Sequence, residues 1–411
     1  MKKFNVPLYY QSNIIEEIRK VREKYDARKK DLSPSIINIG EIDFYIGRHF
    51  GFCYGVKNAI EICYQLIQKY PEKKIYLLSQ MIHNQIVNQD LQDNGVSFIM
   101  DTMGKQLIPW ERITKNDIVI IPAFGTSLET LKILQEKQIN TEKFNTTCPF
   151  VSKVWNRLSQ IAQKGYTVVI YGTANHEETR STFSRASQYG PAIIVENIED
   201  ARLLCDFIKH PKGVSTIHNR FKKKWSKKFN IKTDLTKLGV VNQTTMLASE
   251  TKKIINLFSD AFKSKHKTDE VSNYVANTRD TLCYATNENQ ESTLSLLNNN
   301  VDFAIIAGGY NSSNTTHLVE LISKKTTAFF INSADKISIN NSITHFDIKT
   351  GKEVEKKNFL PNKKCKIILT SGASCPDIIL EKIMLKIVQI KKEVIIEKEI
   401  IERFKKQYTT A

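Results

Sequence analysis

The hydrophobic positions of the chain recur in one pattern: a short run rich in Val and Ile, a polar loop, and apolar residues at helical spacing. Near-continuous Val and Ile runs are typical of strands that are buried on both faces of a parallel sheet. Apolar residues three and four positions apart predict amphipathic helices. Strands that alternate with helices predict an α/β fold, in which right-handed crossovers connect parallel strands.

These strand–loop–helix blocks fall into three sets, and the first block of each set carries a cysteine in its loop. The cysteines are Cys53 in "FGFCYGVKNAI", Cys148 in "NTTCPFVSKVW" and Cys283 in "DTLCYATNENQ". A second polar loop follows 28–30 residues later in each set, with His83, His176 and Asn311. Like units at regular spacing indicate an internal repeat. The sequence therefore predicts three pseudo-symmetric α/β domains, each with a small parallel sheet.

The repeat also predicts where the domains begin and end. We expect an N-terminal, helical extension, three α/β domains and a C-terminal helical tail, over residues 1–45, 46–147, 148–281, 282–389 and 390–411. Ligands of such folds bind at the carboxyl ends of strands and at helix N-termini. If the domains face one another about a threefold axis, their polar loops and the three cysteines converge on one central site.

Composition narrows the class of protein. Of the 411 residues, 41% are hydrophobic and 25% are charged, which is typical of a soluble globular protein. No apolar run approaches the length of a membrane span, and the N-terminus lacks the apolar core of a signal peptide. We therefore expect a cytoplasmic protein without a membrane partner, whose cysteines bind metal or act in catalysis rather than form disulfides.

The formal net charge of +17 agrees with an anionic substrate or with nucleic acid. The lysines are scattered, however, and no segment interleaves basic and aromatic residues in the manner of a nucleic-acid motif. The basic segment 219–232 comes closest, and we interpret it as a solvated loop or helix face. We expect no nucleic-acid partner.

The three loop cysteines predict a metal cluster. Each is expected at a helix N-terminus, where backbone N–H groups and the helix dipole favour the thiolate. The sequence lacks the paired spacing of a zinc finger. Three thiolates suit an iron–sulfur cluster at the centre of the three domains, with one iron left open for a substrate. The remaining cysteines that we interpret as buried structural residues are Cys63, Cys205 and Cys365.

Eight segments, in order along residues 46–389, resemble motifs of the LytB or IspH family of 4-hydroxy-3-methylbut-2-enyl diphosphate reductases. They are "GFCYGVKNAI", "IHN", "TTCPFVSKVW", "NHEET", "NQTTM", "CYATNENQES", "GGYNSSNTTHL" and "TSGASCPD". The segments "PAFGTS", "NHEET" and "VNQTTML" resemble those of the plant and cyanobacterial branch of that family.

This resemblance implies a trilobal α/β fold around an oxygen-sensitive 4Fe–4S cluster. It implies the reductive dehydroxylation of (E)-4-hydroxy-3-methylbut-2-enyl diphosphate, an allylic diphosphate, to isopentenyl and dimethylallyl diphosphate. That reaction is the last step of the methylerythritol phosphate pathway of isoprenoid biosynthesis. The electrons are expected from a ferredoxin or flavodoxin-type donor.

The resemblance also implies roles for individual residues. Cys53, Cys148 and Cys283 match the three cluster ligands. Glu178 matches the catalytic proton donor, and Thr244 matches a threonine that hydrogen-bonds near the substrate hydroxyl. The residues that match or neighbour the diphosphate pocket are His83, His176, Gln243, Ser312, Ser313, Asn314 and Ser374.

Three positions leave alternatives open. Glu177 could be the acid in place of Glu178, although the spacing from His176 favours Glu178. Phe124 stands where many family members have a histidine, so it could pack against the isoprenoid carbons or leave the diphosphate to backbone amides near Gly125. Cys375 could lie near the cluster, and we expect it to be a small residue of the pocket wall.

Two other functions compete with the reductase. Quinolinate synthase also has three α/β domains and a three-cysteine cluster, but it is a condensing lyase, and "NHEET" with "NSSN" counts against it. An iron–sulfur sensor that binds nucleic acid would suit the positive charge, but no DNA-binding module is recognisable.

Overall fold

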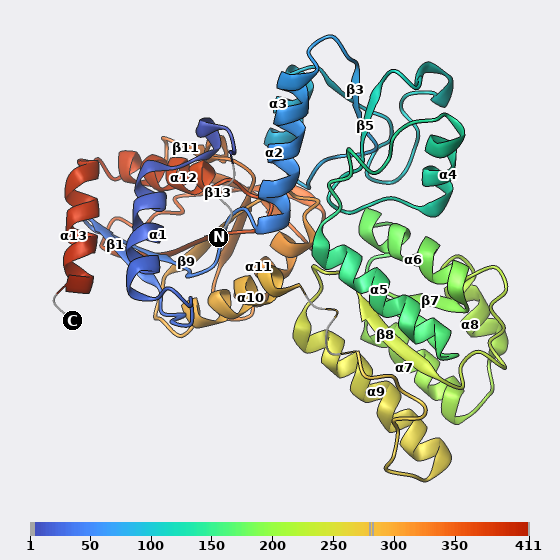
Figure 1. Ribbon diagram of the computed structural model, residues 1–411. Coiled ribbons are helices and arrows are strands. Elements are labelled where there is room, and N and C mark those ends of the chain that lie inside the picture. The colour runs from blue at the N-terminus through green and yellow to red at the C-terminus, as the bar shows by residue number, and fades with distance from the viewer. Residues whose placement is uncertain (1–4, 279–280, 282, 410–411) are drawn as a thin grey trace. The chain divides into compact units, whose positions relative to one another are not determined.

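The computed structural model describes residues 5–278, 281 and 283–409, and the chain forms two compact units (Figure 1). Unit 1 comprises residues 1–57, 83–87 and 284–411. Unit 2 comprises residues 58–82 and 88–283. Helices α2 (Tyr54–Lys69) and α3 (Gln85–Asp93) have residues in both units.

Unit 1 is built on a five-stranded sheet of order β1-β2-β14-β9-β10, in which only β1 and β2 pair antiparallel. The strands of this sheet are β1 (Ser35–Ile39), β2 (Ile42–Ile46), β9 (Phe303–Ala307), β10 (Ala328–Ile331) and β14 (Cys365–Ser371). A separate antiparallel sheet contains β11 (Ile337–Ser338), β12 (Ser342–Asp347) and β13 (Lys352–Lys357). The helices of unit 1 are α1 (Asn13–Tyr25), α10 (Tyr284–Leu296), α11 (Ser313–Ser323), α12 (Asp377–Ile390) and α13 (Glu397–Thr409).

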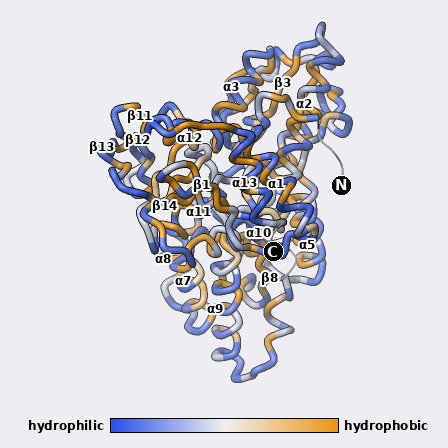
Figure 2. Tube along the Cα trace, turned by 90° about the vertical axis from the view of Figure 1, so that its left-hand side faces the viewer, coloured by the Kyte–Doolittle hydropathy of each residue, from blue (hydrophilic) through white to orange (hydrophobic). Residues whose placement is uncertain are grey.

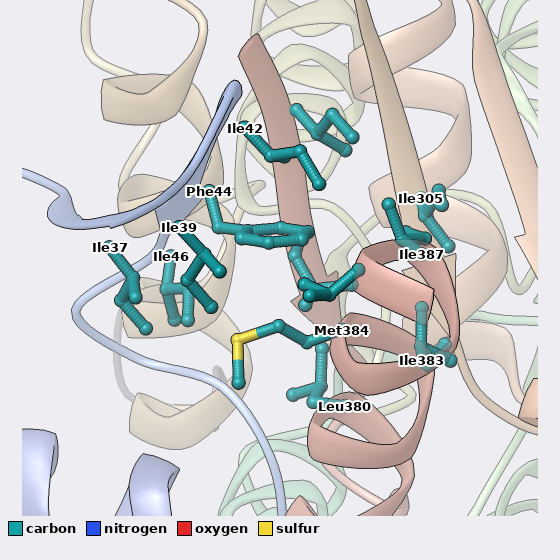
Figure 3. Packing of buried hydrophobic residues seen from close by; sticks show 14 of the residues in the cluster. Ile37, Ile39, Ile42, Phe44, Ile46, Ile305, Leu380, Ile383, Met384 and Ile387 are labelled. Carbon is teal, nitrogen blue, oxygen red and sulfur yellow. The ribbon is translucent and has the colours of Figure 1, made fainter. Parts of the chain in front are cut away.

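Helices cover both faces of the five-stranded sheet, because the side chains of its strands alternate between two apolar clusters. Ile42, Phe44 and Ile46 of β2 pack with α1, α12 and α13 in one cluster. Tyr45, between them, packs with α10 and α11 in the other cluster. Figure 3 shows Leu380 and Met384 of α12 beside the side chains of β1 and β2. In Figure 2 the hydrophobic colour follows β14 and α12.

The hairpin β1–β2 is a feature that the sequence pattern missed. Residues 1–45 contain the expected helix α1, but they also contain β1. The pair Ile39–Ile42 closes a two-residue turn, in which Gly40 has a φ of +52°, a conformation that glycine adopts readily. The C-terminal tail contains helix α13, as expected.

Unit 2 contains two three-stranded parallel sheets, of order β4-β3-β5 and β7-β6-β8. Their strands are β3 (Ile75–Leu77), β4 (Val96–Phe98), β5 (Ile118–Ile120), β6 (Thr167–Tyr171), β7 (Ala192–Val195) and β8 (Leu238–Asn242). The helices that begin in unit 2 are α4 (Leu128–Glu136), α5 (Pro149–Gln163), α6 (Glu177–Tyr189), α7 (Ile198–Lys209), α8 (Val214–Phe221) and α9 (Ala248–His266). Three short 3-10 helices complete the described elements: η1 (Leu8–Tyr10), η2 (Trp110–Arg112) and η3 (Ala334–Lys336).

The same strand order occurs three times, which confirms the predicted α/β class with small parallel sheets. In β4-β3-β5, β7-β6-β8 and β10-β9-β14 the first strand along the chain is central, and the two later strands flank it. The hairpin β1–β2 extends the third set at β14. The boundaries of three domains stay a prediction, since the two compact units do not test them.

The segment before each cysteine runs parallel to the last strand of another set. Strand β2, before Cys53, pairs with β14, and Asn145, before Cys148, pairs with Ile121 directly after β5. Val275, before Cys283, pairs with Leu238 of β8. The segment before the first cysteine therefore pairs with the third set, the segment before the second cysteine with the first set, and the segment before the third cysteine with the second set.

Within the described residues, no helix is both long enough and apolar enough to cross a membrane.

Candidate functional site

A buried carboxyl group lies in unit 2 at the carboxyl ends of two neighbouring strands. Glu178 is the second residue of α6, which follows β6, and only 1% of it is exposed. Thr244 lies in the loop after β8, the parallel neighbour of β6. The backbone N–H of Thr244 donates to Oε1 of Glu178 at 2.6 Å, and its hydroxyl donates to Oε2 at 2.8 Å.

The surroundings of Glu178 suit a proton donor at neutral pH. Burial raises the pKa of Glu178 to about 7, although the two hydrogen bonds from Thr244 act in the opposite direction. A carboxyl group with a pKa near the working pH can hold a proton and release it. The structure thus brings together the two residues that the sequence predicted as catalytic.

Glu177 has a different partner, which favours Glu178 as the acid. The Glu177 carboxylate is also buried, but it accepts a hydrogen bond from the Ser79 hydroxyl, after strand β3. It therefore joins α6 to the neighbouring sheet of unit 2.

Gln243 is held by protein groups on both sides of its amide, and only 1% of it is exposed. Its Oε1 accepts hydrogen bonds from the Thr173 backbone N–H at 3.1 Å and from the Thr179 hydroxyl at 3.0 Å. Its Nε2 donates to the Thr245 hydroxyl at 2.6 Å. The bonds to Thr173 and Thr179 connect the segment around Glu178 to the loop that contains Gln243 and Thr244. We call Gln243 the brace because its side chain holds these two segments together.

Sequence reasoning missed Thr173 and Thr179, the partners of this brace. Thr179 ends the "NHEET" segment, and Gly172, directly after β6, is a second signal. A Cβ atom at Gly172 would lie 2.7 Å from the Thr179 hydroxyl and 2.8 Å from Cβ of Gln243. Glycine is required there because the two loops pack directly against its backbone.

His176 is the N-cap of α6. Its Nδ1 accepts a hydrogen bond from the backbone N–H of Glu178 at 3.2 Å. The ring of Phe124 lies edge-to-face with the imidazole, with 5.4 Å between the ring centroids and 84° between the planes. The structure therefore places Phe124 against His176.

Unit 1 holds the other residues that the sequence assigns to the diphosphate pocket, and several of them lie at helix N-termini. Ser312 is the N-cap of α11, where its hydroxyl accepts the backbone N–H of Thr315 at 3.3 Å. Ser313 is the first residue of that helix. Ser374 precedes α12 and is partly exposed.

Two backbone contacts bring the loops of these residues together in unit 1. Asn314 Oδ1 accepts the backbone N–H of Ala373, next to Ser374, at 2.8 Å. A Cβ at Gly309 would lie 2.2 Å from the carbonyl oxygen of His83, so these two backbones are in close contact. Among the described residues, no group pairs with the buried Nδ2 of Asn314. Hydroxyl and amide donors at helix N-termini suit an anionic group.

Each of the three loop cysteines lies at the start of a helix, as predicted. Cys148 is the N-cap of α5, and Cys53 and Cys283 directly precede α2 and α10. Hydrogen bonds from the backbone N–H groups of Gly55 and Val56 favour the Cys53 thiolate, but burial has the larger effect and raises its pKa.

The cysteines are distributed over both units. Cys53 belongs to unit 1, whereas Cys148 and Cys283 belong to unit 2. Across residues 5–278, 281 and 283–409, no group of three or more His, Cys, Asp and Glu side chains is arranged to hold a metal ion. The structure therefore supports the local environment of each thiol, and their common site stays a prediction.

The other cysteines are buried. Burial raises the pKa of Cys63 and of Cys205 to about 12, so both remain thiols at neutral pH. Cys365 is the first residue of β14, and its pKa is also raised by burial. Cys375 is fully buried in the main apolar cluster of unit 1, and its Sγ lies 3.7 Å from the carbonyl oxygen of Pro376. This environment is that of a packing residue.

Comparison with known proteins agrees with the resemblance found in the sequence motifs. The family model described as "LytB protein" matches residues 45–388. A 4-hydroxy-3-methylbut-2-enyl diphosphate reductase of Gloeothece citriformis is 37% identical over 94% of this chain and 91% of its own length. The reductase of the same name from Synechocystis is 36% identical over 93% of this chain and 96% of its own. Both organisms are cyanobacteria, in line with the predicted branch.

Two solved structures are also similar. One is an (E)-4-hydroxy-3-methyl-but-2-enyl diphosphate reductase, described as the terminal enzyme of the non-mevalonate pathway. It is 26% identical, with a TM-score of 0.51, over 84% of this chain and 98% of its own. The other, a reductase from Plasmodium falciparum, shares the fold at 22% identity, with a TM-score of 0.62 over 91% of this chain and 100% of its own. The family model covers most of the chain, so this chain belongs to the LytB protein family.

Proposed function

We propose that this chain is a reductase that removes the hydroxyl group of (E)-4-hydroxy-3-methylbut-2-enyl diphosphate and forms isopentenyl and dimethylallyl diphosphate. The names of its relatives supply the substrate and the reaction. The observation in this chain that carries the proposal is the buried Glu178, held by two hydrogen bonds from Thr244 and with a pKa near neutrality.

Glu178 is the proton donor of this reaction. A hydroxyl group is a poor leaving group, and it departs as water only when its oxygen receives a proton as the C–O bond breaks. The protonated Glu178 supplies that proton. Thr244 holds both oxygens of the carboxyl group and thereby fixes the direction of transfer.

The substrate carries its negative charge on the diphosphate, and the donors of unit 1 suit that charge. His83, the N-terminal residues of α11 and Ser374 offer imidazole, hydroxyl and amide groups. Sharing the charge among several donors binds a diphosphate without a cluster of lysines. We also assign His176 as a diphosphate donor.

Cys53, Cys148 and Cys283 are the proposed ligands of a 4Fe–4S cluster. The donor set fits this group, since three thiols at helix N-termini match the sulfur ligation of such clusters. When bound, the cluster supplies electrons and a Lewis-acidic iron for the hydroxyl oxygen. A ferredoxin or flavodoxin-type protein of the cytoplasm is the proposed source of the two electrons.

The acid is tested by comparing Glu178→Gln and Glu177→Gln in anaerobic turnover with dithionite and a mediator. We expect Glu178→Gln to lower kcat by about 100-fold or more, because glutamine cannot release the proton. We expect Glu177→Gln to retain most of the activity. Glu199→Gln, an exposed position in the first turn of α7, is the control for the substitution itself. If Glu178→Gln kept full activity, or if only Glu177→Gln lost activity, the proton donor would be a group other than Glu178.

The cluster is tested by iron and acid-labile sulfide analysis of anaerobically reconstituted protein. We expect about four atoms of each per chain, and a loss in Cys53→Ser, Cys148→Ser and Cys283→Ser. Cys63→Ala, which removes a buried thiol from α2, should keep the parent content. A colourless parent protein after reconstitution would contradict the assignment.

A further inference from the structure

Phe124 lies in a loop that is rigidly held in unit 2. The next residue, Gly125, has a φ of +72°, and a Cβ atom there would lie 2.3 Å from the ring of Trp155 on α5. Glycine is therefore required on both conformational and steric grounds. The close contact between Gly125 and Trp155 holds the Phe124 loop directly against α5.

Helix α6 also holds this loop, through two hydrogen bonds to its backbone. The Ser181 hydroxyl donates to the carbonyl oxygen of Phe124 at 3.0 Å, and the Arg185 guanidinium donates to the carbonyl oxygen of Thr126. The Arg185 guanidinium also lies 3.5 Å from the centre of the Trp155 ring. The position of Phe124 is thus set relative to α6, the helix that begins after His176.

The Phe124 ring restricts the plane of the His176 imidazole. The edge-to-face contact, at 5.4 Å and 84°, lies within the range that aromatic pairs prefer. In this orientation Nδ1 of His176 accepts the backbone N–H of Glu178. A nitrogen that accepts a hydrogen bond carries no proton, so this contact fits an imidazole whose proton is on Nε2.

We propose that Phe124 is a positioning residue that keeps the His176 imidazole in the neutral Nε2–H form, as a hydrogen-bond donor to the diphosphate. The assignment of the diphosphate as the acceptor rests on the proposed function. An apolar ring is suited to this role because it fixes the imidazole without offering a hydrogen bond that competes for Nδ1.

The tautomer is measured by 15N nuclear magnetic resonance of the holoprotein labelled with 15N-histidine, with the His176 signals assigned from His176→Asn. We expect the parent and Phe124→Tyr to show the Nε2–H tautomer of His176. We expect Phe124→Leu, which removes the ring, to show signals averaged between the two tautomers. Phe207→Leu makes the same change in the core of α7 and should leave His176 as in the parent. A parent with the proton on Nδ1, or the parent tautomer retained in Phe124→Leu, would overturn the proposal.

Kinetics test the consequence for the substrate. We expect Phe124→Leu to raise KM for the allylic diphosphate at least fivefold and to change kcat less than threefold, with Phe124→Tyr within twofold of the parent in both. A lower kcat at unchanged KM would contradict a role in diphosphate binding. If the parent protein did not convert this substrate at all, the proposed function would fail, whereas the resonance experiment would still decide whether Phe124 sets the tautomer.

Discussion

At the scale of single residues, the candidate acid owes its properties to its environment. The sequence predicted Glu178 from its motif and its spacing to His176, and the structure adds its contact with Thr244. Its raised pKa was not predictable, since it arises from burial by residues that are distant in sequence. The same limit applies to Phe124, whose contact with His176 joins positions 52 residues apart.

The pH dependence of the rate tests this environment. Glu178 must be protonated to donate, so the rate is highest below its pKa and falls as the pH rises through about 7. The Thr244 hydroxyl stabilises the carboxylate and thereby lowers the pKa. Thr244→Val removes this bond. In a plot of the single-turnover rate against pH, we expect the fall on the alkaline side to occur about one pH unit higher than in the parent.

Thr244→Ser is the matched control, because it keeps the hydroxyl group and should retain the parent profile. An alkaline limb that moves to lower pH in Thr244→Val would show that another group controls the rate.

At the scale of elements, the contact between Glu178 and Thr244, the proposed catalytic pair, depends on the register of the segments after two neighbouring strands. The alternation of strands and helices could be predicted because it depends on the local spacing of apolar residues. The pairing of β2 with β14 could not, because partners more than 300 residues apart leave no local pattern. The hairpin β1–β2 is local, with Gly40 in its turn, and the sequence prediction missed it because it assigned residues 1–45 to a helical extension. Likewise, the role of Gln243 as a brace depends on a bond to Thr173, 70 residues away.

The brace predicts a specific kinetic defect. Gln243→Leu removes the two side-chain hydrogen bonds to Thr173 and Thr179 that join the segments, and the bond to Thr245 within its own loop. We therefore expect Thr244 and Glu178 to lose their alignment. We expect kcat to fall by about 10- to 100-fold and KM to stay within about threefold of the parent. Gln135→Leu, at an exposed position of α4, is the control. A Gln243→Leu variant whose KM rises at unchanged kcat would mean that Gln243 acts in substrate binding, as expected from its place next to Thr244 in the sequence.

At the scale of the whole molecule, three sets of parallel strands share one order and are linked by cysteine segments. The repeat was predictable from the spacing of the cysteines and of the loops that follow them. The strand order was not, since it depends on pairing between sets. Unit 1 contains most of the residues that we propose as diphosphate donors, and unit 2 contains the proposed acid. The proposed reductive dehydroxylation of an allylic diphosphate requires both an acid and donors for the diphosphate.

Product analysis in a single anaerobic turnover tests that conclusion most directly. Reconstituted, reduced protein is mixed with (E)-4-hydroxy-3-methylbut-2-enyl diphosphate, and the diphosphates are separated and identified by mass spectrometry. We predict that the substrate is replaced by isopentenyl and dimethylallyl diphosphate. Unchanged substrate, in the presence of protein with a full complement of iron and sulfide, would contradict the proposed function.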